Sequence, residues 1–307
     1  QLNLGLSFSV SYNGLGVGTG MTASVGLCVY DIGGTWYVAG ADIPIALSSS
    51  ETGKIVFPAM VTITAGNSCT YFDVSGIENT GSDPMTFTAA AAGISPTSMS
   101  VHVGTPELRF LQPTLDVGKG LQAKTIVYRY VKDFLFPGTD MLTLDLASSD
   151  PAKASVPPNI VMTSFNAYGL PVDGKVLTGG APVSVSVTPP AGYTVAGPMA
   201  VRVVPPELDF SGLPANLGMG SGLAFDVLVT APGPNYIGDQ ITLEPVTVSL
   251  TSNPDGIVSV PSSVSIAGGA SRSSGAVVNG VAAGSATISA AAAGFAGKTS
   301  AAIVVAP

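Results

Sequence analysis

Few residues in this sequence have side chains suited to catalysis or metal binding: the 307 residues include two cysteines and one histidine. Cys28 and Cys69 could form a redox pair or half of a metal site, but a four-ligand zinc site would lack soft ligands. We therefore predict a structural disulfide between them, with Cα atoms roughly 4.4–6.8 Å apart. Such a bond indicates an oxidising, extracellular compartment.

The remaining candidates for catalysis are the histidine and a few acids. His102 would have to be the base of any Ser–His–Asp site. It stands in an alternating segment, so we expect it to face solvent or to pack at a domain junction. Asp140 and Asp145 could be the two acids of a glycosidase, yet solvated positions on a strand explain them more simply. We predict no catalytic, cofactor-binding or metal-binding residues, and no cofactor.

Glycine-rich and acidic segments could in principle bind phosphate or calcium. Segments 14–18 and 218–220 are glycine-rich, but a phosphate-binding loop needs a following helix, whereas a strand pattern follows here. Calcium sites usually show dense acidic clusters, and segments 239–240 and 253–255 come nearest to one. We interpret all four segments as turns or bulges.

The composition and charge exclude several classes of protein. Glycine (38) and proline (24) are abundant, 10% of residues are charged, and the net charge is −8. Such a chain suits short strands and turns, and its acidity argues against a nucleic-acid partner. Residues 1–30 and 273–297 carry no charge, but neither is a run of about 18–20 strongly apolar residues, so we expect no transmembrane segment.

An internal repeat with a period of 100 residues organises the chain. Its clearest copies are 106–110 with 206–210 and 17–23 with 117–123, followed by a weaker third copy at 217–220. Such a repeat is typical of tandem modules. We predict three domains, at 1–104, 105–204 and 205–307.

Within each unit apolar residues alternate with polar ones, as at 183–187 and 286–290. This is the pattern of half-buried antiparallel strands, and turn signals such as Asn-Gly and Gly-Gly separate the segments. About seven or eight short strands per unit suit an immunoglobulin-like sandwich. We predict an all-β fold of three tandem immunoglobulin-like β-sandwich domains in an elongated rod, with no sheet crossing 104/105 or 204/205.

The third unit carries a family resemblance in segments 258–269, 280–290 and 293–295. They read VSVPSSVSIAGG, GVAAGSATISA and AGF. This pattern resembles that of bacterial immunoglobulin-like (Big-type) repeats, the tandem modules of surface proteins and adhesins. The resemblance implies sandwich modules that serve as spacers, adhesin tips or filament subunits.

The first residues of the chain alternate regularly. Six apolar side chains share one face of the segment: Leu2, Leu4, Leu6, Phe8, Val10 and Tyr12. The segment is interpreted as the first, edge strand of its own domain, or as a donor strand that completes the sheet of a neighbouring subunit. A second notable segment, 128–136, is rich in aromatic and charged residues. We expect it to supply domain core and one solvated face, with a binding face as the alternative.

These features together predict a protein that is not an enzyme. We expect an extracellular or cell-surface structural or adhesive protein, whose sheets bear load and whose proline-marked junctions limit bending. Its partners would be other protein subunits or surface-protein domains, with self-assembly as one form of this. The alternatives are the accessory binding region of a secreted enzyme and a phage or virion decoration protein.

Overall fold

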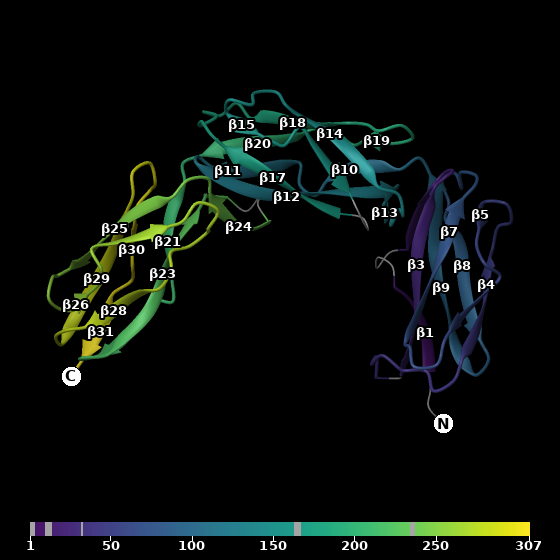
Figure 1. Cartoon of the computed structure of the whole chain (residues 1–307), viewed down its shortest axis with the longest axis horizontal. Helices are drawn as coiled ribbons and strands as arrows, with labels where there is room; N and C mark the ends of the chain where they lie inside the picture. The colour runs from purple at the N-terminus through teal and green to yellow at the C-terminus, as the bar shows by residue number, and fades with distance from the viewer. Residues whose placement is uncertain (1–3, 10–13, 32, 163–166, 234–236) are drawn as a thin grey trace.

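The computed structural model describes residues 4–9, 14–31, 33–162, 167–233 and 237–307. These residues form 31 strands and no helix, and the strands group into three sandwiches in tandem (Figure 1). The prediction of an all-β fold of immunoglobulin-like sandwiches is confirmed. Short strands follow from the abundant glycine and proline, which interrupt each alternating segment after a few residues.

The first sandwich contains nine strands in the described part of the chain. Their order is β5-β7-β3-β1-β9-β8-β4-β6, with β2 also paired to β9. The strands β5, β7, β3 and β1 form one half of the sandwich, and β9, β8, β4 and β6 form the other. A parallel contact between β1 and β9 joins the two halves. The bounds are β1 Leu4–Ser9, β2 Leu15–Gly18, β3 Thr22–Asp31, β4 Ile43–Ser49, β5 Ile55–Val56, β6 Met60–Ile63, β7 Cys69–Gly76, β8 Met85–Ala91 and β9 Ile94–Gly104.

The second sandwich consists of two sheets. One has the order β15-β17-β12-β10-β19 with β13 beside β12, and the other β11-β20-β18-β14-β16. The bounds are β10 Glu107–Phe110, β11 Thr114–Gly118, β12 Leu121–Val131, β13 Phe134–Leu135, β14 Leu142–Ser148, β15 Ala154–Ser155, β16 Asn159–Met162, β17 Ala167–Gly174, β18 Val183–Thr188, β19 Thr194–Val195 and β20 Met199–Val204.

The third sandwich repeats this plan. Its sheets have the orders β21-β23-β28-β26 and β22-β31-β29-β25-β27, with β30 beside β29. The bounds are β21 Glu207–Ser211, β22 Asn216–Gly218, β23 Gly222–Thr230, β24 Ile237–Thr242, β25 Val246–Asn253, β26 Val258–Ser259, β27 Ser263–Ile266, β28 Ala276–Gly280, β29 Gly284–Ala291, β30 Lys298–Thr299 and β31 Ile303–Ala306.

The cores lie between the two sheets of each sandwich, as alternation predicts. In β12 every second residue is buried, from Leu121 to Val131. The buried apolar side chains of the first two sandwiches form one continuous cluster, and those of the third form another. Leu121 belongs to the cluster of the third sandwich, although its strand lies in the second. The sandwiches therefore share apolar contacts at both junctions.

The three sandwiches do not lie along a straight line. Figure 1 shows them following one another along an arch, with the N and C marks at its two feet. The chain of sandwiches is elongated, and its long axis bends at the two junctions. The reason lies in the junctions, where a segment of each later sandwich attaches to the side of a strand in the sandwich before it.

One sheet crosses a predicted boundary. Strand β24 of the third sandwich pairs antiparallel with β12 of the second, with Leu121 opposite Thr242 and Gln122 opposite Ile241. The prediction that no sheet crosses 204/205 is wrong. Strand β10 covers only the second half of β12, from Val127 to Tyr130, so the first half has a free edge on that side. A free strand edge pairs readily with another strand.

Candidate functional site: the junctions between the sandwiches

The first junction contains backbone hydrogen bonds between two sandwiches. The amide N–H of Ser24 in β3 donates to the carbonyl oxygen of Pro137 (3.2 Å), and the N–H of Thr139 donates to the carbonyl of Thr22 (3.1 Å). The segment 136–140 of the second sandwich thus lies along the start of β3. Among the described residues, β1 pairs with β3 only from Gly26 onward, and the incoming segment pairs with the part of β3 before that residue.

Aromatic packing closes the same junction. His102 in β9 is buried, and its ring lies 4.9 Å from the ring of Phe134 in the second sandwich. Its Nδ1 lies 3.2 Å from the hydroxyl oxygen of Thr80. Of the two positions expected for this histidine, the structure shows the packing position at a junction. Burial, followed by the charge of Lys132, lowers the pKa of His102.

We expect the first junction to weaken in mild acid. The carboxylates of Asp83 and Asp133 favour protonation of His102, but burial and Lys132 outweigh them. The pKa of His102 in the folded chain lies below the ordinary value of 6.5. At pH values between the folded and the unfolded pKa, unfolding therefore takes up a proton. Stability is therefore complete above pH 6.5 and falls as the pH drops below it. Melting temperatures measured between neutral and mildly acidic pH check this, and His102→Gln should flatten the dependence. An equal pH dependence in that variant would contradict it.

A buried arginine holds the segment 136–140 in place. The side chain of Arg129 in β12 is fully buried; its Nη1 donates to Asp140 Oδ1 (2.7 Å) and to the hydroxyl of Tyr193 (3.2 Å). Its Nη2 donates to the carbonyl of Asp140 (3.2 Å), and the guanidinium lies 5.7 Å from the ring centre of Phe136. A buried charge is stable only when paired in this way. Arg129 therefore positions the segment that joins β3.

The second junction continues the backbone pairing over a longer strand. In β24, Ile237 lies opposite Lys124, and the pairing extends to Leu121 and Thr242 at the other end. Beyond the strand, the N–H of Leu243 donates to the carbonyl of Gly120 (2.9 Å). Both junctions thus share one arrangement: a segment that follows the third strand of one sandwich pairs with the third strand of the sandwich before it.

A buried glutamine strengthens the second junction. The side-chain oxygen of Gln240 accepts a hydrogen bond from the N–H of Gly118 (2.8 Å), and its amide nitrogen donates to the carbonyl of Asp116 (3.0 Å). Gln240 is 1% exposed. One amide therefore satisfies two backbone groups of β11. The prediction that segment 239–240 forms a turn is wrong, because these residues lie within β24.

Asp116 also takes part in this junction. Its carboxylate accepts hydrogen bonds from Nε and Nη2 of Arg202, both at 2.6 Å. Gly233 of the third sandwich has a φ of 118°, and a Cβ there would lie 2.4 Å from Asp116 Oδ2. Only glycine suits that position, because any side chain would meet the carboxylate and strain the backbone. The close approach fixes the third sandwich against β11.

The disulfide forms, but within one sheet. Cys28 and Cys69 lie directly opposite each other on β3 and β7, with an S–S bond and Cα atoms 4.0 Å apart. The prediction of a bridge is confirmed, whereas the predicted Cα separation of roughly 4.4–6.8 Å is too long. Directly paired residues of antiparallel strands are held closer than cysteines on separate sheets. The bridge therefore locks the register of β3 against β7.

The N-terminal segment lies inside its own sheet. Strand β1 pairs antiparallel with β3 and parallel with β9, so the structure places it between two neighbours, and its predicted position at an edge is wrong. Leu6 is buried, Leu4 and Phe8 are partly buried against the core, and the ring of Phe8 lies 5.7 Å from that of Phe87. The other members of the predicted apolar face, Leu2, Val10 and Tyr12, lie outside the described residues.

The segment 128–136 supplies both core and surface. Tyr128 and Tyr130 point away from the core with ring centres 5.9 Å apart, and the guanidinium of Arg109 lies 4.9 Å from the ring centre of Tyr130.

Of the two acids considered for catalysis, Asp145 is exposed on β14. The structure does not pair Asp145 with Asp140, whose carboxylate binds Arg129.

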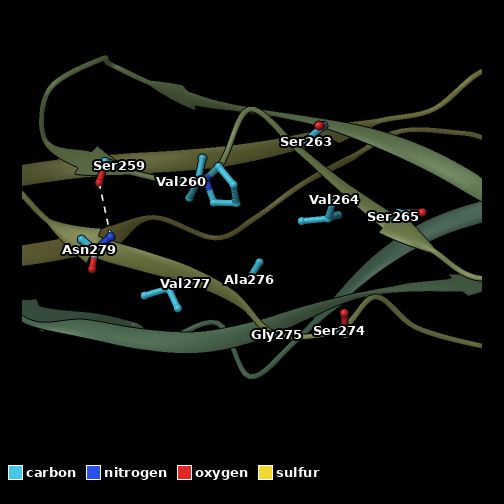
Figure 2. Close-up of a pocket in the computed structure, with 11 residues that line it drawn as sticks. Ser259, Val260, Ser263, Val264, Ser265, Ser274, Gly275, Ala276, Val277 and Asn279 are labelled. Carbon is cyan, nitrogen blue, oxygen red and sulfur yellow. Dashed lines mark hydrogen bonds between the residues drawn. The ribbon is translucent and has the colours of Figure 1, made fainter.

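An open depression of about 560 Å³ lies on the surface of the third sandwich, between β26, β27 and β28. Figure 2 shows its lining of serines and small apolar side chains, with Asn279 donating to Ser259 (3.5 Å) at one end. None of the residues that line it is charged or aromatic. The depression therefore offers neither an acid–base pair nor a stacking surface.

Two further features are absent from the described ranges. In that part of the chain no three His, Cys, Asp or Glu side chains gather as a metal site would need. The same part contains no helix with the length and apolar character required to span a membrane.

Comparison with known proteins finds tandem sandwiches. No protein-family model and no curated protein matches the sequence. Domains 4–9 of the surface layer protein SbsC are 15% identical, with a TM-score of 0.30, over 100% of this chain and 48% of that one. The Escherichia coli adhesin FdeC is 11% identical (TM-score 0.26; 100% and 99% covered), and the titin I9–I11 tandem 12% identical (0.25; 97% and 99%). Similarity this low establishes no shared function.

Proposed function

We propose that this chain is a non-enzymatic structural protein of the extracellular space or cell surface, which holds immunoglobulin-like domains at fixed angles. Its domains would be 1–104, 105–204 and 205–307, as the repeat predicts. The observation that carries the proposal is the backbone pairing at both junctions, of segment 136–140 with β3 and of strand β24 with β12. Flexible tandem proteins are joined by linkers with few contacts; here backbone hydrogen bonds and shared apolar contacts join the domains.

Three further features support this role. The disulfide suits an oxidising compartment. The sequence pattern of 258–269 and 280–295 supports membership of the bacterial immunoglobulin-like repeats. The buried polar side chains of Arg129 and Gln240 each form hydrogen bonds at a junction. The partners of such a protein would be other subunits or surface-protein domains, bound through exposed strand edges and apolar side chains.

The proposal predicts a narrow distribution of distances across the second junction. Spin labels can be attached at Thr143→Cys in β14 and Thr247→Cys in β25, which are both exposed positions. Double electron–electron resonance then measures the distribution of distances between the two labels. Gln240→Ala should broaden the distribution, because the Gly118 N–H and Asp116 carbonyl lose their partner at a cost of about 1–3 kcal/mol each.

Asn279→Ala is the matched control for this measurement. It removes a carboxamide whose hydrogen bond to Ser259 stays within the third sandwich, so the distribution should remain narrow. A native protein with a distribution as broad as that of the Gln240 variant would contradict the proposed rigid role.

A further inference from the structure

The two junctions within the chain use an edge that the third sandwich also has. A hydrogen bond of the same kind precedes the third strand in each sandwich: Gly20, Gly120 and Gly220 donate to the carbonyls of Gly76, Gly174 and Gly280 at 2.8, 2.7 and 2.8 Å. The residues that follow, 22–24, 122–124 and 222–224, are therefore structural equivalents. The first two sets are covered by the next sandwich.

The third edge is exposed. Strand β23 pairs with β21 only from Asp226 onward, and no strand of the described chain lies beside 222–224 on the side away from β28. The exposure of equivalent side chains shows the difference: Ala23 is 0%, Ala123 is 1% and Leu223 is 49% exposed. A large apolar side chain thus stands in solvent at the position that both junctions bury.

The first sandwich has the complementary segment without a partner sandwich. The N–H of Tyr37 donates to Val29 (3.0 Å) as that of Phe136 donates to Arg129 (2.9 Å), so segment 36–40 is equivalent to 135–139. Val38 then corresponds to Pro137, whose carbonyl accepts from β3. Within the described chain, Trp36 and Val38 are 55% and 59% exposed.

We propose that segment 36–40 of one copy adds to the edge 222–224 of a second copy, so that copies associate head to tail. The expected pairing follows from the first junction: Ser24 bonds Pro137 and Thr22 bonds Thr139, so Ala224 N–H would donate to the Val38 carbonyl and Gly40 N–H to the Gly222 carbonyl. Trp36 and Leu223 supply the apolar contact. Each copy offers one donor segment and one acceptor edge, which makes the contact heterologous and the assembly open-ended.

Charge sets a condition on this association. Residues 1–104 contain six acids and one base, and residues 205–307 contain six acids and two bases. The first and third sandwiches, both net acidic, repel each other at low ionic strength, and salt screens the repulsion between exposed charges. Association should therefore strengthen as the salt concentration rises, which is opposite to what a contact held by ion pairs would show.

Sedimentation velocity of the whole chain over a wide range of concentration, at low and high salt, tests the proposal. We expect oligomers that grow with concentration and with salt. Leu223→Lys should raise the dissociation constant at least about tenfold, as a charge at the buried position of a contact does. Trp36→Ser removes the contact from the opposite end and should act in the same direction. Val304→Lys is the matched control, since Val304 is 47% exposed on the other sheet of the same sandwich.

Cross-linking checks the register directly. Copies carrying Val38→Cys mixed with copies carrying Ala224→Cys should form an intermolecular disulfide, whereas Val38→Cys mixed with Val304→Cys should not. A chain that stays monomeric at every concentration and salt overturns the proposal, and so does association that Leu223→Lys and Trp36→Ser leave unchanged. These outcomes concern contacts between copies, so the structural role proposed above is tested separately by the distances within one copy.

Discussion

Replacing Asp140 with alanine should destabilise the second sandwich by about 3 kcal/mol, because it leaves a fully buried guanidinium without its charged partner. Arg129 would retain the hydroxyl of Tyr193 and the carbonyl of residue 140, and its Nε already lacks a hydrogen bond among the described atoms. The effect lies at the lower end for buried pairs because the Asp140 side chain is 46% exposed, so water can enter the space it leaves. Chemical denaturation with a fit for each sandwich measures the loss.

A second substitution makes this result specific. Arg129→Met in the same chain removes the unpaired charge, so the double variant should be more stable than Asp140→Ala alone. Asp133→Ala is the matched control, because the Asp133 side chain is 90% exposed where it pairs with Arg109 and its loss should change stability little. A double variant that is less stable than both single variants would contradict a penalty from an unpaired buried charge.

Removing the disulfide should have an effect of similar size, confined to the first sandwich. The bridge closes a loop with a sequence separation of 41 residues, and the chain-entropy model assigns such a loop about 3–4 kcal/mol. For a domain of this size the loss corresponds to a fall in melting temperature of more than about 10 °C. Calorimetry of the Cys28→Ala/Cys69→Ala variant measures it.

The comparison needs a control for the substitution itself, because Cys28 is buried. Reduction of the native chain with dithiothreitol breaks the bond without changing a side-chain volume, and it should lower the same transition by a similar amount. The transition of the third sandwich should not move. An unchanged melting temperature after both treatments would show that the pairing of β3 with β7 holds the register without the bond.

The sandwiches themselves could be predicted because the information for them is local. Segments that alternate with a period of two form strands, as 183–187 does in β18. The Cys28–Cys69 pair forms because β3 and β7 are neighbours in one sheet. The 100-residue repeat also reflects equivalent turns, as the matching hydrogen bonds of Gly20 and Gly120 show. Each of these features lies within one unit.

The junctions could not be predicted because their partners lie in different units. Gln240 bonds Gly118, which is 122 residues earlier, and no local pattern connects the two. A polar pair at 239–240 within a glycine- and proline-rich region is typical of a turn, so the sequence predicts a turn where the structure has strand β24. Arg129 lies between Val127 and Val131 on the core face of β12. A charged residue on that face is explained only by Asp140, which is distant in the strand pattern and pairs with it in the structure.

The device at the junctions has a consequence for how such a chain can gain or lose length. The second unit receives a segment from the third and supplies one to the first, at the same positions of the repeat. Duplication or deletion of a whole unit therefore preserves the backbone part of the junction and requires no new interface. The side chains are different at each junction, with Phe134 at one and Gln240 at the other. The shared backbone pattern tolerates changes in the number of units, while these two side chains fit each junction to its own pair of units.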